Sequence, residues 1–391
     1  MAVESPNLPP EGGLTGWLTV LGGFFITFCS FGTAQSFGVY QDYYAQTLLP
    51  NYSLSDISWI GSAQLFFLFF TGLPAGKLFD TGHFRECLVF GCLLFVFSTF
   101  MLSLVQQSQY YQVFLAQAMG TGIASGFMFA PALSVVSHYF TRRRSLAMGI
   151  VMSGSCLGAI IYPIMLNNLF NGKVGFAWGV RATAFMDIGL LAFANVIMKA
   201  KPKSSKRPGL EQDGFGAIMR DVPYWLNTLG CGCMFIGVFV PVFYIQLFTQ
   251  MHGLSPSLSF YTISILNAAS LFGRILPNFV ADMYVLIVCT ALTGALTFVM
   301  LAATTVAGAV VFTLLYGFFS GSSISLATPA AASFSKSLGE VGVRIGLGTL
   351  VAGVASLIGP PIAGALVQSH GSYQWYRPVV FAAVSCVLLV C

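Results

Sequence analysis

Charge is what this 391-residue sequence has least of. Lysine and arginine number 17, aspartate and glutamate number 12, and together they make up only 7% of the residues. A soluble domain carries about 25% charged residues. Hydrophobic residues make up 56% of the chain, and the mean hydropathy is +0.82. A soluble fold of this length cannot cover its surface with so few charges, which excludes a cytosolic enzyme, a nucleic-acid binder and a disordered chain.

The sequence also lacks the residue groups that catalytic and metal sites need. No Ser/His/Asp set, glycine-rich phosphate loop or acidic metal cluster is visible, and none of the 4 histidines pairs with an acid at a useful spacing. The 9 cysteines fall almost entirely within apolar stretches, so we predict buried free thiols. The sequence therefore predicts no enzyme activity, no metal site and no cofactor.

Long uncharged stretches take up most of the chain, at residues 12–41, 57–76, 87–141, 145–172, 222–273, 283–335 and 345–376. A helix that spans a bilayer needs about 20 apolar residues, so the longest stretches, split by polar turns, hold two helices each. The runs are apolar on all faces and do not alternate, which favours membrane helices over a membrane barrel. The sequence predicts an all-α membrane protein with twelve transmembrane helices, at about 16–40, 57–78, 86–104, 111–139, 146–169, 176–198, 223–249, 258–281, 284–305, 309–333, 345–367 and 376–391.

Basic residues are distributed unevenly between the two sides of this predicted bundle. If the N-terminus is cytoplasmic, the connections on that side hold Lys77, Arg85, Arg142, Arg143, Arg144, Lys199, Lys201, Lys203, Lys206, Arg207, Arg220, Lys336 and Arg344. The other side holds Lys173 and Arg377, with Arg181 at a helix end. The positive-inside rule therefore predicts that both termini are cytoplasmic.

One extended hydrophilic segment divides the chain. We predict an N-terminal six-helix half at 1–198, a basic cytoplasmic linker at 199–222 and a C-terminal six-helix half at 223–391. The linker is either a solvated connection or a surface that binds anionic lipid. The eighth and ninth helices are joined by little more than Asp282 and Met283, and the twelfth ends with the chain at Cys391. We expect this short connection and this short last helix to mean either that the chain is a shortened gene model or that the protein has reduced stability.

The segment Gly76-Lys-Leu-Phe-Asp80-Thr-Gly82-His-Phe-Arg85 lies between the second and third predicted helices. Its glycines permit a tight turn, and Asp80 can face the positive N-terminal end of a neighbouring helix. The pattern resembles the G-x-L-x-D…G…R signature of the major facilitator superfamily, with Thr81 in place of the usual basic residue. The resemblance implies a conformational latch between the cytoplasmic ends of the two halves, with Asp80 against the start of the eleventh helix. The candidate latch residues are Gly76, Asp80, Arg85, Arg143 and Arg344.

A more specific pattern joins the fourth and fifth predicted helices. Tyr139-Phe-Thr-Arg-Arg-Arg-Ser-Leu-Ala-Met-Gly149, followed by Ser153-Gly-Ser-Cys-Leu-Gly158, resembles the Y-F-x-x-R-R-x-x-A-x-G…G-S…G signature of the monocarboxylate porters. Further segments are similar to the fungal branch of that family: Ser36–Tyr44, Ile57–Ser62, Asn267–Arg274 and Leu357–Gly364. The resemblance covers nearly the whole chain. It implies two pseudo-symmetric six-helix halves, a central cavity and alternating access, with small organic acids as cargo and the proton as a frequent coupling ion.

Ionisable residues inside the predicted spans are few, and such residues are costly and usually functional. Arg274 matches the eighth-helix arginine of the family and is a candidate to hold a substrate carboxylate with two parallel hydrogen bonds. A structural pair or a contact with backbone carbonyls is the alternative. Asp187 is a candidate proton-coupling residue, or else is protonated or turned towards the core. The other candidate substrate residues, for which simple packing is the alternative role, are Gln35, Phe127, Tyr162, Asn167, Tyr244, Gln246 and Asn267.

We interpret the sequence as a secondary active transporter of a small organic acid or an acidic metabolite in the plasma membrane. Two alternatives stay open: an efflux pump for neutral lipophilic metabolites, and a membrane sensor that uses a transporter fold but moves no cargo. The expected partners are a small carboxylate substrate, the lipid bilayer and protons, and the oligomeric state stays open. Asn51-Tyr-Ser53 is a glycosylation sequon, which the topology places in the first outer loop.

Overall fold

The structure is a computed structural model that describes residues 12–170, 172–201, 215–280, 283–336, 340–369 and 372–387. In these ranges, 11 helices are long and apolar enough to cross a membrane, and a shorter apolar helix, Tyr376–Val387, follows them. Their order along the chain is that of the twelve predicted helices. The all-α membrane fold predicted from the sequence is therefore confirmed.

The first six spans contain several breaks in regular helix. They are α1 (Gly13–Gln35) with α2 (Phe37–Tyr43) and the π-helical turn η1 (Tyr44–Leu48); α3 (Leu54–Phe70) with α4 (Gly72–Thr81); α5 (Phe84–Leu102); α6 (Tyr110–Val113) with the π-helical η2 (Phe114–Thr121), α7 (Gly122–Ser134) and η3 (Val135–His138); α8 (Arg144–Phe170); and α9 (Gly175–Ile197). The first span thus runs on to Leu48, beyond its predicted end at residue 40, because Tyr40, Tyr44 and Leu48 are all buried.

The last six spans follow the short helix α10 (Phe215–Met219). They are α11 (Val222–Met251); α12 (Pro256–Ile275) with η4 (Pro277–Val280); α13 (Met283–Val299) with η5 (Met300–Ala302); α14 (Val306–Ser333); α15 (Val341–Val367); and α16 (Tyr376–Val387). Between α15 and α16, the strands β1 (Gln368–Ser369) and β2 (Ser372–Tyr373) pair antiparallel. The predicted linker residues 202–214, Asp282 and Cys391 lie outside the described residues, so the predictions made for them stay predictions.

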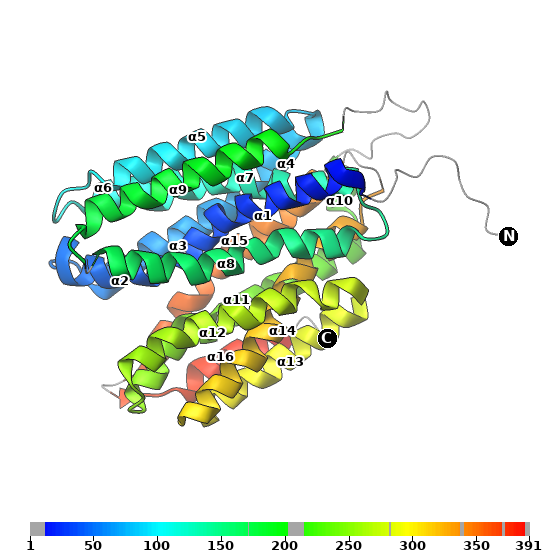
Figure 1. The fold of residues 1–391 in the computed structure, drawn as a ribbon. Coiled ribbons are helices and arrows are strands. Elements are labelled where there is room, and N and C mark those ends of the chain that lie inside the picture. The colour runs from blue at the N-terminus through cyan, green and yellow to red at the C-terminus, as the bar shows by residue number, and fades with distance from the viewer. Residues whose placement is uncertain are drawn as a thin grey trace, which may run out of the picture.

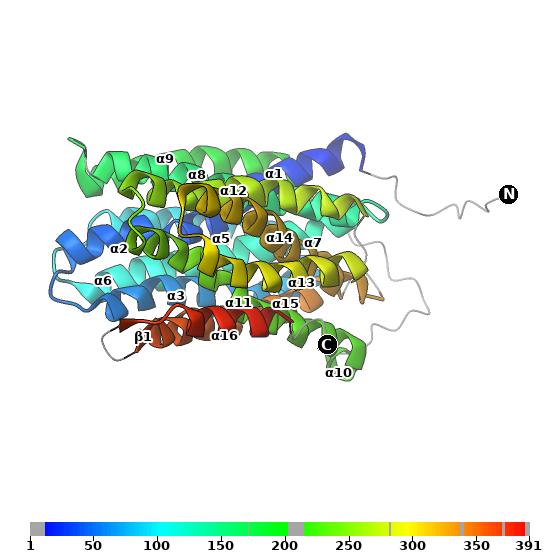
Figure 2. The ribbon, with the colours of Figure 1, turned by 90° about the horizontal axis from the view of Figure 1, so that it is seen from below.

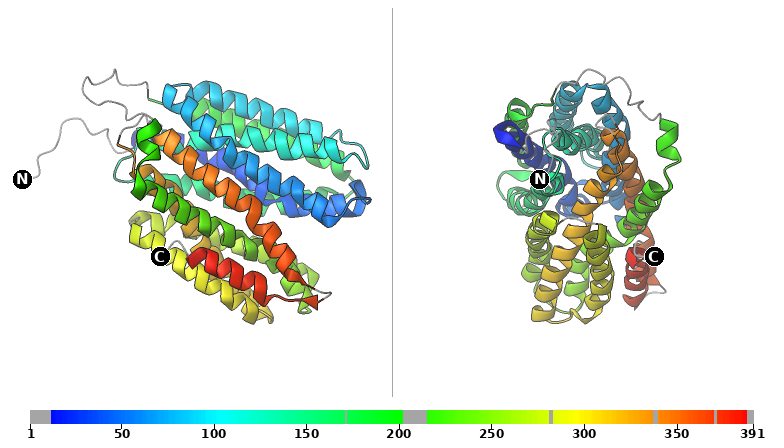
Figure 3. Two further views of the ribbon diagram at one scale, coloured as in Figure 1. Left: turned by 180° about the vertical axis from the view of Figure 1, so that it is seen from behind. Right: turned by 90° about the vertical axis from the view of Figure 1, so that its right-hand side faces the viewer.

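The spans form one bundle of two groups. Figure 1 shows α1 to α9, coloured blue to green, in the upper part of the bundle, and α11 to α14 and α16 in the lower part, while the orange α15 runs behind α1 and α8 and packs on both groups. Figure 2 shows that the long helices run roughly along one direction, as helices that cross a membrane must. The end-on view in Figure 3 shows the same two groups, with the orange α15 against the blue helices of the first group. We call them the first half and the second half.

Short sequence signals set several helix ends. Ser53 and Asp56 form a capping box at the start of α3, with the Ser53 hydroxyl accepting from the Asp56 amide at 3.1 Å. Asp221 caps α11 by accepting from the Tyr224 amide at 3.3 Å. Gly82 ends α4 with φ 102°, in the left-handed region that favours glycine.

Glycines let neighbouring helices pack backbone to backbone within each half, as is common in lipid. A Cβ at Gly154 of α8 would lie 2.1 Å from the carbonyl oxygen of Phe24 in α1. In the second half, a Cβ at Gly273 of α12 would lie 2.0 Å from the carbonyl oxygen of Phe318 in α14. The described cysteines are all free, and all are buried except the half-buried Cys233.

The connections at one end of the bundle, which we call the basic end, hold most of the described basic residues: Lys77, Arg85, Arg142, Arg143, Arg144, Lys199, Lys201, Arg220, Lys336 and Arg344. The opposite end, which we call the far end, carries Asn51, Lys173 and Arg377. The positive-inside rule predicts that the basic end is cytoplasmic.

Candidate functional site

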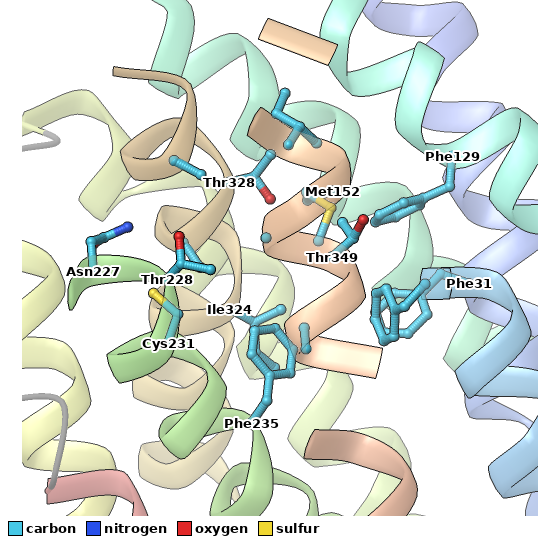
Figure 4. A pocket seen from close by; sticks show the side chains of 16 residues that line it. Phe31, Phe129, Met152, Asn227, Thr228, Cys231, Phe235, Ile324, Thr328 and Thr349 are labelled. Carbon is cyan, nitrogen blue, oxygen red and sulfur yellow. The ribbon is translucent and has the colours of Figure 1, made fainter. Parts of the chain in front are cut away.

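A small cavity of about 40 Å³ lies where the two halves meet. Figure 4 shows Phe31 and Phe129 approaching it from one side, and Asn227, Thr228 and Cys231 from the opposite side. The lining residues are Phe31, Phe69, Phe129 and Met152 from the first half, and Asn227, Thr228, Cys231, Phe235, Ile324, Ala327, Thr328, Ala331, Ile345, Gly348, Thr349 and Ala352 from α11, α14 and α15. Sites for drug-sized ligands measure about 300–1,000 Å³, so this cavity must widen before it can hold a metabolite.

Aromatic rings make up the part of the lining that bridges the two halves. The Phe31 ring lies 5.7 Å from that of Phe69 and 5.9 Å from that of Phe129, and Phe69 lies 6.1 Å from Phe235 of α11, between ring centroids. Among the polar lining groups, the buried Asn227 Nδ2 has no hydrogen-bond partner in the described part of the chain. The cavity therefore offers aromatic surface and an amide donor that is free to bind a ligand.

At the basic end, α4 and α15 are in direct contact, and we call this contact the first closure. The Asp80 carboxylate accepts hydrogen bonds from the backbone amides of Gly342 at 3.0 Å and Val343 at 2.8 Å, in the first turn of α15. A carboxylate is favourable at this position because the N-terminal end of a helix is electropositive. A Cβ at Gly76 would lie 2.1 Å from the Gly342 carbonyl oxygen, so the two backbones are in direct contact.

A second closure, between α8 and α12, is centred on Arg274. This side chain is only 1% exposed, and its Nη1 donates to the Met152 carbonyl oxygen at 2.9 Å and to Ser155 Oγ at 2.5 Å, both in the first half. The guanidinium carbon lies 6.0 Å from the centroid of the Phe31 ring. No carboxylate of the described residues forms an ion pair with Arg274.

Asn278 extends the same interface by one helical turn. Its Nδ2 donates to the Arg274 carbonyl oxygen at 2.8 Å and to Ser325 Oγ at 2.9 Å, while its Oδ1 accepts from Ser145 Oγ of α8 at 2.6 Å. Gly149 is required here, because a Cβ would lie 2.3 Å from the Arg274 carbonyl oxygen. Each closure joins the second span of one half to the fifth span of the other, so the two are equivalent by position in the fold.

The residues predicted to bind substrate do not come together, and none of the eight lines the cavity. Arg274 lies behind Met152 and Phe31, which do line it. Tyr162 donates to Asp187 inside the first half. Phe127 packs edge-to-face on the exposed Phe90 at 5.1 Å, on the outer side of the bundle.

The other five predicted substrate residues are dispersed over several helices. Asn267 donates to the Ile263 carbonyl oxygen at 3.0 Å within its own helix, and Tyr244 donates to the Pro360 carbonyl oxygen at 3.1 Å. Gln35, Asn167 and Gln246 are half-buried. The sequence could not have singled out the cavity phenylalanines, because they are a few among 37.

The predicted latch residues occupy the basic end but divide into separate contacts. Gly76 and Asp80 meet α15 directly, Arg85 donates to the Asn195 carbonyl oxygen of α9, and Arg143 is exposed. Their role as a latch stays a prediction.

Arg344, the fifth predicted latch residue, is buried at the start of α15. Its Nη1 lies 2.8 Å from Asp221 Oδ2 and its Nε lies 3.5 Å from Glu340 Oε2, while its guanidinium carbon sits 4.9 Å from the Tyr224 ring centroid. Burial alone would raise the pKa of Asp221. The hydrogen bonds from Arg344 and from the Tyr224 amide, together with the positive charges of Arg344 and Lys336, outweigh burial and hold that pKa below its usual range. Asp221 was not predicted, although an aspartate just before Val222-Pro223 is a helix-start signal.

Replacing Arg344 by methionine should lower the melting temperature, because a hydrogen bond between charged groups contributes about 1.5–3 kcal/mol. The folded-state pKa of Asp221 is depressed, so its contribution is present above the ordinary aspartate pKa of about 3.9 and is lost as the pH falls through the folded pKa. The difference between Arg344→Met and the parent should therefore shrink in acid. Thermal melting in detergent measures it, with Lys77→Met at an exposed position as control. Equal melting temperatures for both variants would contradict the prediction.

Comparison with known proteins places this chain in a family. The sequence model of the Major Facilitator Superfamily matches residues 23–285. The chain belongs to the Major Facilitator Superfamily. It is thus a multi-pass membrane transporter of a small molecule and not an enzyme.

Fungal relatives support the same assignment over most of the chain. The Aspyridones efflux protein apdF of Emericella nidulans is 40% identical over 380 residues, which cover 95% of this chain and 77% of the relative. The Agnestins efflux protein AgnL12 of Paecilomyces divaricatus is 40% identical over 358 residues, which cover 90% and 81%. These relatives are named as efflux proteins and not as monocarboxylate porters, so the family is shown at the level of the superfamily.

A solved structure shares the fold of this superfamily member. FucP, a Major Facilitator Superfamily transporter crystallised in the outward conformation, superposes with a TM-score of 0.72 and 16% identity, over 95% of this chain and 96% of FucP. At that identity the likeness concerns the fold alone.

Proposed function

We propose that this transporter exports a small, largely apolar metabolite that carries an aromatic or conjugated ring system. The observation that carries the proposal is the cavity lining, in which phenylalanines from both halves surround the space and Asn227 offers an unpartnered amide donor. Ring stacking supplies binding energy for such a cargo, and the amide suits a carbonyl group on it. The names of the two efflux relatives support export of a fungal secondary metabolite.

Alternating access follows from the two closures. With α4 against α15 and α8 against α12, the basic end is shut, and the cavity of about 40 Å³ is too small for cargo. Release of both closures would open a path to the basic end. If that end is cytoplasmic, cargo binds from the cytoplasm and leaves at the far end.

An acidic cargo is the second candidate, and a specific observation favours it. Arg274 Nε is buried without a partner in the described part of the chain, directly behind the cavity wall. A cargo carboxylate that displaced the Met152 carbonyl could take two parallel hydrogen bonds from the guanidinium. The Tyr139–Gly149 segment, which resembles the monocarboxylate porters, points to the same substrate class.

The plasma membrane is the proposed location. Asn51 is exposed in a far-end connection, where its Nδ2 lies 3.5 Å from Ser108 Oγ. If the far end is extracellular, this side chain is open to glycosylation during export through the secretory pathway.

Transport into inside-out plasma-membrane vesicles from an expressing yeast strain tests the proposal, with aspyridones and agnestins as probe cargoes. We expect uptake only into vesicles that carry the transporter. Removing a buried aromatic group at a binding hot spot costs about 2 kcal/mol or more, so Phe235→Ala should lower uptake at least about tenfold. Asn227→Leu should weaken binding of carbonyl-bearing cargo.

The matched control is Phe243→Ala, at an exposed position of the same helix α11. Equal losses in both phenylalanine variants would show that the cavity wall does not bind cargo. Binding of a probe without flux in sealed vesicles would favour the sensor alternative and overturn the export proposal.

A further inference from the structure

A carboxyl group is buried inside the first half, away from the cavity. Asp187 of α9 is 1% exposed, and the hydroxyl of Tyr162 in α8 donates a hydrogen bond to its Oδ1. Tyr162 is itself 0% exposed and packs against Phe28 of α1, with 5.2 Å between ring centroids. Asp187 does not line the cavity, and the hydrogen bonds that hold the two closures do not involve it.

The groups around Asp187 are polar but carry no positive charge. The Cys29 thiol of α1 and the Tyr162 hydroxyl of α8 hydrogen-bond to the carboxyl, and Tyr40 of α2 is close enough to interact with it electrostatically. From α5, which also packs on α9, the titratable groups are Arg85, Glu86, Cys87 and Cys92. Cys92 accepts a hydrogen bond from the Asn195 side chain, and Arg85 donates to the Asn195 carbonyl oxygen, about two helical turns nearer the basic end than Asp187.

The nearest basic residue on α9 is directed elsewhere. Arg181 donates from Nε to Ser103 Oγ at 3.1 Å, and its guanidinium lies 4.9 Å from the Trp178 ring centroid. No lysine or arginine among the described residues forms an ion pair with Asp187. The charge on an ionised Asp187 would therefore be uncompensated in this conformation.

An ionised carboxylate without a counter-ion is strongly unfavourable in a dry protein interior. The arrangement seen here suits the neutral acid, which can donate its own proton in a hydrogen bond while accepting the one from Tyr162. Loss of the proton to water would create a buried negative charge, and only a movement that hydrates the site would relieve it.

Helix α8 connects this site to the closure of the basic end. The same helix carries Tyr162 and, about two turns earlier, Ser155, which accepts from Arg274 across the interface. It also carries Met152 and Ser145, which bond to Arg274 and Asn278. A shift of α8 away from α9 at Tyr162 would therefore disturb the contacts that hold α8 on α12.

We propose that Asp187 and Tyr162 form a proton-binding site that couples cargo movement to protons. The proton is held while the basic end is closed, and it leaves to water when α8 moves and the basic end opens. In an exporter, this order exchanges an entering proton for a departing cargo. The inference rests on the proposed function and names its coupling ion.

Infrared difference spectroscopy of the reconstituted full chain tests proton binding without any cargo. A change of pH should produce a carboxylic-acid C=O band in the parent protein. Asp187→Asn, which keeps the size and hydrogen-bonding capacity of the side chain, should remove this band, and Tyr162→Phe should shift its frequency because the hydroxyl donor is gone. The control Glu86→Gln, at an exposed position of α5, should leave it unchanged. A band of equal intensity in Asp187→Asn overturns the proposal.

Disulfide trapping tests the link to conformation. The double variant Ser145→Cys/Asn278→Cys should form a disulfide only when the basic end is closed, because Ser145 Oγ and Asn278 Oδ1 lie 2.6 Å apart in this conformation. Coupling energies between sites change populations about 5- to 150-fold, so raising the pH should lower the yield of the disulfide at least about fivefold. The comparison is with the same cysteine pair in the Asp187→Asn background, because the pH dependence of the thiols themselves is the same in both proteins.

Equal pH dependence in the two backgrounds overturns the proposal. If the pH dependence is equal but vesicles with the parent protein still take up cargo, the proton coupling is wrong and the proposed export function stands. If vesicles with the parent protein take up no cargo although disulfide trapping depends on pH through Asp187, the proposed export function is overturned instead.

Discussion

Adding a single methyl group at Gly76 should remove most of the transport activity. The Cβ of Gly76→Ala would lie 2.1 Å from the backbone carbonyl oxygen of Gly342, which has no flexible side chain to yield. The helices α4 and α15 must then separate, and Asp80 loses its hydrogen bonds to Gly342 and Val343. Overpacking of this kind costs about 1–3 kcal/mol, so the closed state should fall in population by about 5- to 150-fold.

Vesicle uptake and the disulfide trap described above measure the two consequences of Gly76→Ala. The matched control is Gly189→Ala, also a helical glycine, where an added Cβ meets nothing within 4 Å. Asp80→Asn should produce a smaller shift in the same direction, because it removes the charge but not the close approach. Normal uptake and normal trapping in Gly76→Ala would refute the role assigned to this contact.

Arg274→Lys should lower transport by about 10- to 100-fold while the protein still reaches the membrane, since hydrogen bonds to charged groups contribute about 1.5–3 kcal/mol. Lysine keeps the charge, but its side chain is one bond shorter, so its ammonium nitrogen cannot occupy the position of Nη1, which donates to both the Met152 carbonyl and Ser155. The contact between α8 and α12 is thereby weakened.

The kinetic pattern of Arg274→Lys separates the two cargo classes. If the cargo is neutral, the loss falls on kcat with KM unchanged, because Arg274 then acts only in closing the basic end. If the cargo is a carboxylate, KM rises as well. Initial rates over a range of cargo concentrations distinguish these outcomes, with Arg181→Lys at the far end as control. Parental kinetics in the lysine variant would contradict both roles.

The sequence by itself determined the membrane class, the number and order of the spans and the superfamily. The class, number and order of the spans follow from local properties: runs of uncharged residues long enough to cross a bilayer, and turn and helix-end residues such as Gly82 at the end of α4. The superfamily follows from the resemblance of the Gly76–Arg85 segment to its signature. Gly76 and Asp80 could also be singled out, because their motif is continuous in the chain. Each of these features can be recognised within a few tens of residues.

Only the tertiary structure decided which side chains share a site. Three contacts join residues on different helices: Arg274 with Ser155, Asp80 with Gly342, and Asp187 with Tyr162. In the first two, the partners are also far apart in the chain. Span composition could not indicate that Phe127 faces outward while Phe129 lines the cavity. In a chain whose spans are apolar on every face, the hydrophobic pattern does not tell the protein side of a helix from the lipid side. The contacts between helices decide it, through close glycine packing and the few polar groups that must find a partner away from water.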